Sequence, residues 1–309
     1  MTAANTQARK DFVAIDDYSL EELRSILDLA RKQKPLARNH ELPHSHPNRV
    51  LACVFAKPSL RTRISFEVAM GQLGGKSLFV TDKEIGMGKR ESVHDVAKVL
   101  SRLVDGIMIR WFDHDEVVQL AEHATVPVVN GLTDLNHPCQ VMADIMTIEE
   151  HLGSIDGKTV VMVGDGNNLA NSWLNASIRF PFNFILACPE GYTPDEGILR
   201  KAEAAGASFM ITHDPREAVE GAHVIYSDAF YSMGQEAEAQ QRRKDFAPFR
   251  ITTELLAEAD PGHIVLHCLP AHRGEEITDE VMDGPHSVVF DEAENRLHAQ
   301  RAILATLIK

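Results

Sequence analysis

Short apolar runs alternate with helix-like patterns along most of the chain. Val50 to Phe55 (VLACVF) is a continuous apolar run of the kind found in buried parallel strands, and a helical pattern follows it as far as Gln72. Before this run, the sequence SLEE (19–22) has the form of a capping box and predicts an amphipathic helix over about 19 to 33. Repeated strand–helix units of this kind predict a parallel, doubly wound α/β sheet.

The same alternation continues through both halves of the sequence. In the first half it predicts strands at 77–80, 105–110 and 126–129 and helices at 91–103, 114–123 and 138–152. In the second half it predicts strands at 159–163, 183–187, 207–211, 223–227, 264–266 and 287–290, and helices at 168–179, 195–205, 215–220, near 278 and at 291–307. The polar segment 233–247 is predicted to be a mobile loop or an exposed helix. Two series joined by the long helix 138–152 therefore predict an α/β protein with two doubly wound parallel-sheet lobes.

Composition narrows the class of protein. The chain has 309 residues, of which 44% are hydrophobic and 25% are charged, as is typical of a globular protein long enough for two domains. Its 45 acidic and 31 basic residues give a net charge of −14, which disfavours broad binding to nucleic acid. An anionic substrate would therefore need a pocket that concentrates positive charge.

Cysteine usage and apolar content predict a cytoplasmic protein. The four cysteines are widely spaced and include no CxxC, so we expect reduced thiols rather than disulfides. The N-terminus lacks the apolar core of a signal peptide, and no stretch of about 18 residues is continuously apolar. We therefore expect neither secretion nor a membrane span.

The segment SLRTR (59–63) lies where the first predicted strand passes into a helix. Free backbone N–H groups, hydroxyls and guanidinium groups at such a position favour an anion, and phosphate is the natural ligand. From the spacing alone, a serine cap with arginines in surface ion pairs is an equally good interpretation. The segment HPCQ (137–140) follows another strand, and a neutral histidine with a glutamine amide can polarise a carbonyl oxygen and hold an amide nitrogen. A His-Pro pair more often simply begins a helix.

Three further polar segments follow predicted strands of the second half. GDGNN (164–168) resembles the first turn of a dinucleotide fold, but Leu169 replaces the third glycine and no acidic residue ends the next strand, so a nicotinamide cofactor is disfavoured. A turn that binds a small polar ligand and a purely structural turn both remain open. DAFYSMG (228–234) and HCLP (267–270) are also on the expected ligand-binding edge, beyond the carboxyl ends of strands.

The cysteines suggest two other kinds of chemistry. Cys268 is a candidate nucleophile, but nothing local supplies a base, and a buried structural cysteine is the more frequent case. A zinc site formed by His137, Cys139, His267 and Cys268 lacks metal-ligand spacing. We therefore predict no metal site.

Taken together, these segments resemble the carbamoyltransferase family that includes the aspartate and ornithine enzymes. The resemblance spans residues 11–308 and rests on SxRTR (59–63), HPxQ (137–140), HCLP (267–270), ENR (294–296) and Arg110, which closes the strand GIMIR. The DxxxSMG loop, here 228–234, is similar to the ornithine branch specifically, and GDGNN and MGQE (233–236) agree with that branch.

The resemblance implies an activity that needs no cofactor. This activity is transfer of the carbamoyl group of carbamoyl phosphate to the δ-amine of L-ornithine, giving L-citrulline and phosphate, in arginine biosynthesis or in the reverse direction. It implies that a first domain, 1–137 plus 291–309 with the last helix returning to it, binds carbamoyl phosphate. Residues 138–152 would link this domain to an ornithine-binding domain at 153–290. Members of the family are usually homotrimers or multiples of trimers.

The implied site residues follow from the matching motif positions. Those expected at carbamoyl phosphate are Ser59, Leu60, Arg61, Thr62, Arg63, Arg110, His137, Gln140, Cys268, Leu269 and Arg296. Those expected at ornithine are Asn168, Asp228, Ser232 and Met233. The residues expected to take part in catalysis are Arg110, His137, Cys268 and Arg296.

The sequence departs from the family pattern at two positions. Leu60 stands where a threonine is common, and Gly86 replaces the usual Gln or His in a loop that reaches a neighbouring subunit in the family. Lys89 or Arg90 is a candidate substitute for that side chain, with screened surface charge as an equal alternative. Two competing hypotheses are a relative that binds carbamoyl phosphate without turnover, and an enzyme that carbamoylates another amine or aspartate.

Overall fold

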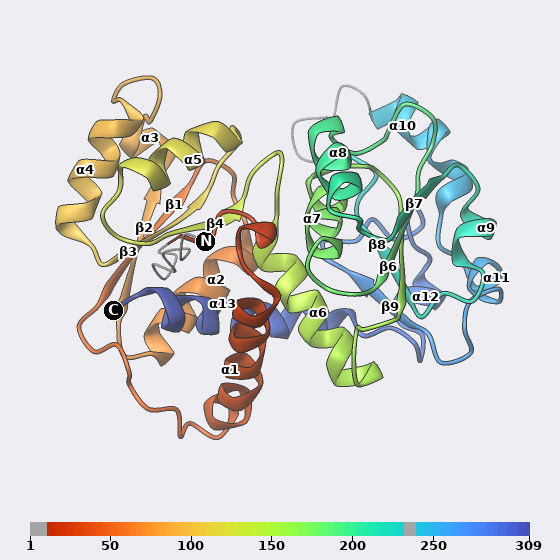
Figure 1. Ribbon diagram of the computed structural model, residues 1–309, viewed down its shortest axis with the longest axis horizontal. Coiled ribbons are helices and arrows are strands. Elements are labelled where there is room, and N and C mark those ends of the chain that lie inside the picture. Colours follow the sequence, from red (N-terminus) through yellow and green to blue (C-terminus); the bar gives the residue numbers. More distant parts are fainter. Residues whose placement is uncertain (1–10, 232–238) are drawn as a thin grey trace, which may run out of the picture. The chain divides into compact units, whose positions relative to one another are not determined.

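The computed structural model describes residues 11–231 and 239–309, and the chain divides into two compact units (Figure 1). The first unit comprises Met1–Cys139 and Arg296–Lys309, and the second comprises Gln140–Asn295. The boundaries fall within helices α6 (Pro138–Leu152) and α13 (Val289–Leu307). Each unit is built on its own parallel sheet with flanking helices, which confirms the predicted fold class. The C-terminal helix ends in the first unit, as predicted.

The first unit has a four-stranded parallel sheet in the order β2-β1-β3-β4. Its strands are β1 (Val50–Phe55), β2 (Lys76–Thr81), β3 (Gly106–Arg110) and β4 (Val128–Leu132). Its helices besides the end of α13 are η1 (Ile15–Asp17), α1 (Leu20–Arg38), α2 (Leu60–Gln72), α3 (Asp82–Ile85), α4 (Val93–Leu103) and α5 (His114–His123). Because β2 and β3 lie on opposite sides of β1, the winding of the sheet changes direction at β1, which is where open α/β sheets bind their ligands.

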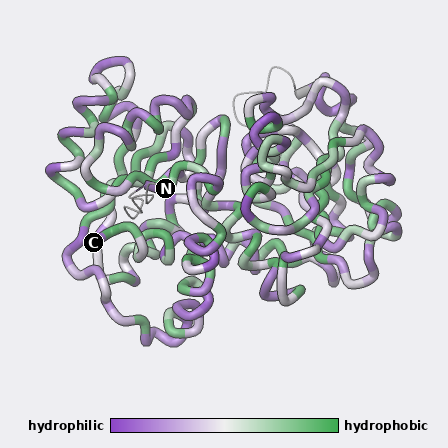
Figure 2. The backbone as a smooth tube through the Cα atoms, in the orientation of Figure 1, coloured by the Kyte–Doolittle hydropathy of each residue, from purple (hydrophilic) through white to green (hydrophobic). Residues whose placement is uncertain are grey.

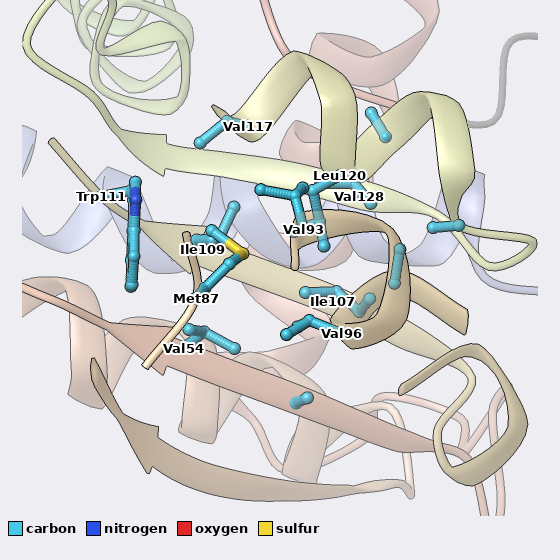
Figure 3. Close-up of a cluster of buried hydrophobic side chains, with 14 of the residues drawn as sticks. Val54, Met87, Val93, Val96, Ile107, Ile109, Trp111, Val117, Leu120 and Val128 are labelled. Carbon is cyan, nitrogen blue, oxygen red and sulfur yellow. The ribbon is translucent and has the colours of Figure 1, made fainter. Parts of the chain in front are cut away.

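The core of the first unit fills the space between the sheet and helices α4 and α5 (Figure 3). Val93 and Val96 of α4, together with Val117 and Leu120 of α5, pack against side chains of β1, β3 and β4. Each fully buried side chain of this size contributes about 1.5–3 kcal/mol of transfer free energy. The packed sheet is rigid, so it holds the loops that follow its strands in fixed positions. In Figure 1, α1 and α2 lie on the opposite face of the same sheet from α4 and α5.

The second unit has a five-stranded parallel sheet in the order β7-β6-β5-β8-β9. Its strands are β5 (Thr159–Val163), β6 (Asn183–Ala187), β7 (Phe209–Thr212), β8 (Val224–Ser227) and β9 (Ile264–His267). Its helices besides α6 and the start of α13 are α7 (Asn168–Ser177), α8 (Glu196–Ala204), α9 (Pro215–Val219), α10 (Ala239–Asp245), η3 (Ala247–Phe249), α11 (Thr253–Leu256) and α12 (Asp279–Met282). The winding changes direction at β5, between β6 and β8.

Trp173 of α7 anchors one face of the second sheet. Its ring lies 6.3 Å from that of Phe184 in a stacked arrangement and 5.9 Å from that of Tyr226 in an edge-on one, measured between ring centroids. In both units the backbone segments of the interior are largely hydrophobic, whereas the outer helices alternate between hydrophilic and hydrophobic residues (Figure 2). None of the helices in the described ranges has the length and apolar character needed to cross a membrane.

One predicted strand is wrong. The apolar run at 287–290 forms no strand, because Val289 already begins α13 and only Ser287 makes an isolated bridge, to Val265. The first helix is also longer than predicted, since α1 continues through Pro35 to Arg38. In the polar segment 233–247, α10 begins at Ala239, and residues 232–238 lie outside the described ranges.

Candidate active site

The segment SLRTR forms the start of α2, directly beyond the carboxyl end of β1. Ser59 is the N-cap residue, and its hydroxyl accepts a hydrogen bond from the backbone N–H of Thr62 at 3.4 Å and donates one to Oγ1 of Thr62 at 3.1 Å. Thr62 is fully buried, whereas Arg61 is half-buried and the side chain of Leu60 is exposed. The first turn of the helix therefore carries its remaining N–H groups at the expected ligand-binding edge.

Two buried guanidinium groups converge on the Thr62 hydroxyl. Nη2 of Arg296 donates to Oγ1 of Thr62 at 2.9 Å, and Nη1 of Arg110 lies 3.5 Å from the same oxygen. Arg110 ends β3, which is the neighbour of β1 in the sheet, and Arg296 belongs to the part of α13 in the first unit. Positive charge concentrated beside a helix N-terminus suits a phosphate or another small anion.

His137 is buried close to the same arginines. Burial, together with the positive charges of Arg296 and Arg110, holds the pKa of His137 well below its ordinary value. The imidazole is therefore neutral at neutral pH, with one ring nitrogen that donates and one that accepts. The turn before it is closed by Thr133, whose hydroxyl accepts from the N–H of Asn136 at 3.1 Å.

Replacing His137 with glutamine is expected to change how stability depends on pH. Since the pKa of His137 is lowered by folding, the unfolded chain binds more protons than the folded one below about pH 6.5, and the free energy of unfolding falls there as the pH drops. One such group contributes a slope of up to about 1.4 kcal/mol per pH unit, which His137→Gln should lose. Urea unfolding of both proteins between pH 5 and 8 measures this difference. Parallel curves would contradict the neutral buried imidazole.

The structure does not bring Arg63 into this cluster. Its Nε donates to Oε1 of Glu67 at 2.9 Å, and its guanidinium lies over the ring of Phe79, 4.0 Å from the centroid. Arg61 and Arg63 are two residues apart on a helix and so point to different sides. The predicted role of Arg63 at a phosphate remains a prediction.

Lys57, which was not among the predicted site residues, connects two of the motif loops. Its Nζ lies 2.5 Å from Oδ1 of Asp134 and 4.3 Å from the ring centroid of Phe112. The ion pair joins the loop that precedes Ser59 to the loop that precedes His137. The position of a lysine two residues before an anion-binding segment was the available signal.

In the second unit, Asp228 follows β8 at the edge where the winding of the sheet changes. Its Oδ1 accepts hydrogen bonds from the thiol of Cys268 at 3.0 Å and from the backbone N–H of Ala229 at 2.8 Å. Its Oδ2 accepts from Nδ2 of Asn167 at 2.9 Å, and Asn167 also caps α7 through the N–H of Leu169. Three segments named from the sequence, GDGNN, DAFYSMG and HCLP, thus meet at one carboxylate.

The contact with Asp228 decides the state of the Cys268 thiol. Burial and the adjacent carboxylate raise the pKa of Cys268 well above its ordinary value. The thiol is therefore protonated, and its S–H donates the hydrogen bond to Asp228. A neutral thiol is a poor nucleophile, so this geometry favours a role in which Cys268 orients a neighbouring group.

The backbone after Cys268 is held by His267. Nδ1 of His267 accepts from the N–H of Leu269 at 2.9 Å, which leaves the proton on Nε2, 3.0 Å from Oε1 of the fully buried Glu276. Leu269 has φ of +57°, a left-handed conformation that costs energy for a residue other than glycine. The histidine and glutamate hold this strained conformation and so fix the direction of the Leu269 carbonyl.

Gln140 belongs to the second unit and is fully buried on α6. Its Nε2 donates to Oδ1 of Asp144 at 2.8 Å and to Oε1 of Glu292 at 3.0 Å. Its Oε1 has no hydrogen-bond partner within the described ranges. A buried acceptor without a donor is a candidate contact for a substrate N–H.

The remaining predicted residues differ in what can be said of them. Asn168 is the first residue of α7, next to the capping Asn167. Asp165 of the same turn pairs with Arg242 of α10, whose Nη1 lies 2.8 Å from Oδ2 of Asp165. Ser232 and Met233 lie outside the described residues. Across residues 11–231 and 239–309, no three His, Cys, Asp or Glu side chains are grouped so that they could hold a metal ion.

Two family models match the chain in succession. Residues 10–150 match the carbamoyl-phosphate-binding domain of aspartate/ornithine carbamoyltransferase, and residues 156–307 match the Asp/Orn-binding domain. The chain belongs to the aspartate/ornithine carbamoyltransferase family. This carbamoyltransferase is 49% identical over 308 residues to the anabolic ornithine carbamoyltransferase of Pyrococcus furiosus, with 97% of each chain covered. It is 50% identical over 302 residues to the ornithine carbamoyltransferase of Brucella suis, covering 98% of this chain and 96% of the other.

Comparison with solved structures agrees. The structure of ornithine carbamoyltransferase from Pyrococcus furiosus superimposes on this carbamoyltransferase with a TM-score of 0.93 and 48% identity, covering 97% of each chain. The resemblance inferred from five short motifs is therefore confirmed over nearly the whole length.

In this carbamoyltransferase, the loop at 84–90 that departs from the family pattern is held by hydrogen bonds between its own residues. Gly86 ends α3 with φ of +63°, a conformation that glycine adopts without cost. The Arg90 guanidinium donates to the carbonyl oxygens of Glu84 and Ile85. Arg90 is thus engaged within its own loop, and Lys89 is exposed.

Proposed function

We propose that this chain is an ornithine carbamoyltransferase, which transfers the carbamoyl group of carbamoyl phosphate to the δ-amine of L-ornithine and releases L-citrulline and phosphate. The observation that carries the proposal is identity of 49–50% with proteins named ornithine carbamoyltransferase, over nearly the full length of each chain. The two clusters of candidate residues support it, since one is suited to an anion and the other to an amine.

Carbamoyl phosphate is held by the first unit in this proposal. Its phosphate binds the N–H groups at the start of α2, the hydroxyls of Ser59 and Thr62, and the guanidinium of Arg61. Its carbamoyl oxygen receives hydrogen bonds from Arg110, His137 and Arg296. The convergence of Arg110 and Arg296 on Thr62 supports this arrangement, because the two guanidinium groups already point to one place.

The same donors stabilise the transition state. The δ-amine attacks the carbamoyl carbon, and the carbonyl oxygen becomes an oxyanion. Each well-aimed donor to that oxygen is typically worth about 100-fold in rate or more. The bond between the carbon and the phosphate oxygen then breaks, and the departing phosphate accepts the proton that the amine loses.

The amine must be neutral before it attacks. By analogy with lysine its pKa is about 10.4, so keeping it deprotonated at pH 7 costs about 4.6 kcal/mol. Exclusion of water and the nearby guanidinium groups both disfavour a second cation at the reacting position. Asp228 pairs with the α-ammonium of ornithine, with Asn168, Ser232 and Met233 at the same end, and Cys268 faces the δ-amine.

One assay tests the proposal against its competitors. The full chain is incubated with carbamoyl phosphate and, separately, ornithine, acetylornithine, putrescine or aspartate, and the carbamoylated product is quantified. We expect citrulline formation to exceed the other three reactions at least about 100-fold in kcat/KM, because each alternative lacks a group that the site binds. Binding of carbamoyl phosphate without any product would instead support the non-catalytic relative.

We also propose a homotrimer, or a multiple of trimers, in the cytoplasm. Leu60, Ile64 and Val68 form an exposed apolar stripe along α2, which supports contact with another copy of the chain. All four cysteines are free thiols, which supports a reducing compartment. A light-scattering mass of three chains, or a multiple of three, is the expected result.

A further inference from the structure

Two carboxyl groups that the proposed mechanism does not use are buried together in the second unit. Asp144 lies on α6 and Glu292 near the start of α13, and both are completely inaccessible to solvent. Nε2 of Gln140 donates to both side chains, which brings the two carboxyl groups next to each other. Buried carboxylates are costly, so a pair of them needs an explanation beyond chance.

The pair determines which way the amide of Gln140 faces. Both N–H bonds of Nε2 are used, one toward Asp144 and one toward Glu292, at 2.8 and 3.0 Å. The amide oxygen is therefore directed away from the two acids, and it has no donor within the described residues. An amide flipped by 180° would place its oxygen against two acidic oxygens, so the acids permit only one orientation.

Glu292 has further partners that require it to be the ionised member. Its Oε2 accepts from the backbone N–H of His267 at 2.8 Å, and its Oε1 accepts from the hydroxyl of Tyr226 at 3.0 Å as well as from Gln140. Every one of these partners is a donor. A carboxylate accepts from all of them, whereas a neutral acid would turn one of its oxygens into a competing donor.

Asp144 has the opposite environment. Its Oδ1 accepts from Gln140, but no donor reaches its Oδ2 within the described ranges. Burial and the charge of Glu292 raise the pKa of Asp144 well above its ordinary value. Three other titratable groups lie nearby. Burial and the proximity of both acids raise the pKa of Tyr226, and the charge of Glu292 contributes to the raised pKa of Cys268. His267 lies close enough to Glu292 to favour its ionised form.

We propose that Asp144 and Glu292 share one proton, carried on Asp144, and act as a positioning pair that presents the amide oxygen of Gln140 to the NH₂ group of the carbamoyl donor. This inference rests on the proposed function. The pair therefore holds one proton and one negative charge. The O–H of Asp144 donates a hydrogen bond to Glu292, Glu292 keeps the negative charge, and no net charge is transferred. The pair touches no substrate itself and works through Gln140 and the backbone of His267.

The chemistry of the donor substrate explains the need for such a pair. The NH₂ group of carbamoyl phosphate can only donate, so it is matched by an acceptor and rejected by the NH₂ end of glutamine. Acetyl phosphate has a methyl group at this position and leaves the buried acceptor unpaired, which should weaken binding by about 5- to 150-fold. A fixed amide oxygen therefore selects a carbamoyl phosphate over an acyl phosphate.

Asp144→Asn and Asp144→Leu form the matched test. In Asp144→Asn the side-chain oxygen still accepts from Gln140 and the NH₂ group replaces the proposed O–H donor, so we expect kcat/KM for carbamoyl phosphate within about threefold of wild type. Asp144→Leu removes both interactions, and we expect a loss of about 10- to 100-fold. Glu292→Gln places an NH₂ group where a donor must be accepted, and we expect a similar loss.

The preference of each variant for carbamoyl phosphate over acetyl phosphate distinguishes a positioning role from a general structural role. The ratio of the acetyl phosphate inhibition constant to the KM for carbamoyl phosphate should fall in Asp144→Leu and stay near wild type in Asp144→Asn. A structural role would weaken both ligands equally and leave the ratio unchanged. If Asp144→Asn loses as much activity as Asp144→Leu, Asp144 is needed as a carboxylate and the inference is wrong.

The proton itself is measured without turnover. An infrared difference spectrum between wild type and Asp144→Asn at neutral pH should contain the C=O band of a protonated carboxylic acid in wild type only. This measurement stands even if Asp144→Leu does not fold. Absence of that band would overturn the shared proton, whereas absence of citrulline from wild type with the band present would overturn only the proposed function.

Discussion

Replacement of Arg110 by methionine is expected to lower kcat for citrulline formation by about 100- to 1,000-fold. Methionine fills a similar volume but has no donor, so the developing oxyanion loses a charged hydrogen bond. Arg110 is buried with Nη1 3.5 Å from the Thr62 hydroxyl, and Arg296 approaches the same hydroxyl at 2.9 Å. The remaining guanidinium cannot replace the missing one because it is already engaged at its own position. Initial rates at saturating ornithine and carbamoyl phosphate measure the effect.

Arg49→Met is the matched control for Arg110→Met. Arg49 lies at the opposite end of the same sheet, just before β1, and forms a partly exposed ion pair with Asp105 at 2.8 Å. Ion pairs of this kind contribute about 0–1 kcal/mol to stability, so the variant should fold and turn over normally. A kcat for Arg110→Met within tenfold of the control would show that Arg110 is not an oxyanion donor.

The position of the site edge was predictable from the sequence, but the grouping of residues on it was only partly so. VLACVF and TVVMV are continuous apolar runs followed by polar turns, and ligands bind beyond the carboxyl ends of such strands. That Arg110 meets Thr62 depends on β3 pairing directly with β1, where Phe55 lies beside Arg110. Strand order is set by tertiary packing, since β2 comes between them in the sequence. The resemblance of the motifs to the family predicted that Arg110 and Thr62 lie at the same site, whereas hydrophobic periodicity alone could not predict this.

The strand predicted at 287–290 failed for a reason visible in α13. An apolar run of four residues is ambiguous between strand and helix, and the helix predicted at 291–307 in fact begins two residues earlier, at Val289. The helix buries polar side chains along much of its length, among them Glu292, Asn295, Arg296 and Arg301. Polar residues normally mark the solvent face of a helix, so the burial of Glu292, Asn295 and Arg301 is not apparent from the sequence. The same burial explains why Asp144 and Glu292 were not recognised as parts of the site.

Some local features could have been read more closely. The spacing of Arg61 and Arg63 by two residues already predicts that they point to different sides of a helix, and the structure places Arg63 against Glu67 and Phe79. Asn167 was overlooked in favour of its neighbour Asn168, although an asparagine before a helix is a common N-cap. Its second role, as a donor to Asp228, depends on the pairing of β5 with β8.

Replacement of Asp228 by asparagine is expected to lower kcat/KM for ornithine by about 100- to 1,000-fold, or about 3–4 kcal/mol, because the α-ammonium would lose its half-buried counter-charge. The affinity for carbamoyl phosphate, measured by calorimetry without ornithine, should change less than about threefold, since its expected ligands in the first unit are untouched.

Cys268→Ser is the companion variant: a hydroxyl can still donate to Asp228, so turnover should slow but persist. Equal losses of affinity for both substrates in Asp228→Asn, or a covalent carbamoyl adduct on Cys268 found by mass spectrometry during turnover, would contradict these roles. The neutral thiol held by Asp228 makes such an adduct the less favourable chemistry, because only a thiolate attacks readily and burial beside a carboxylate suppresses it.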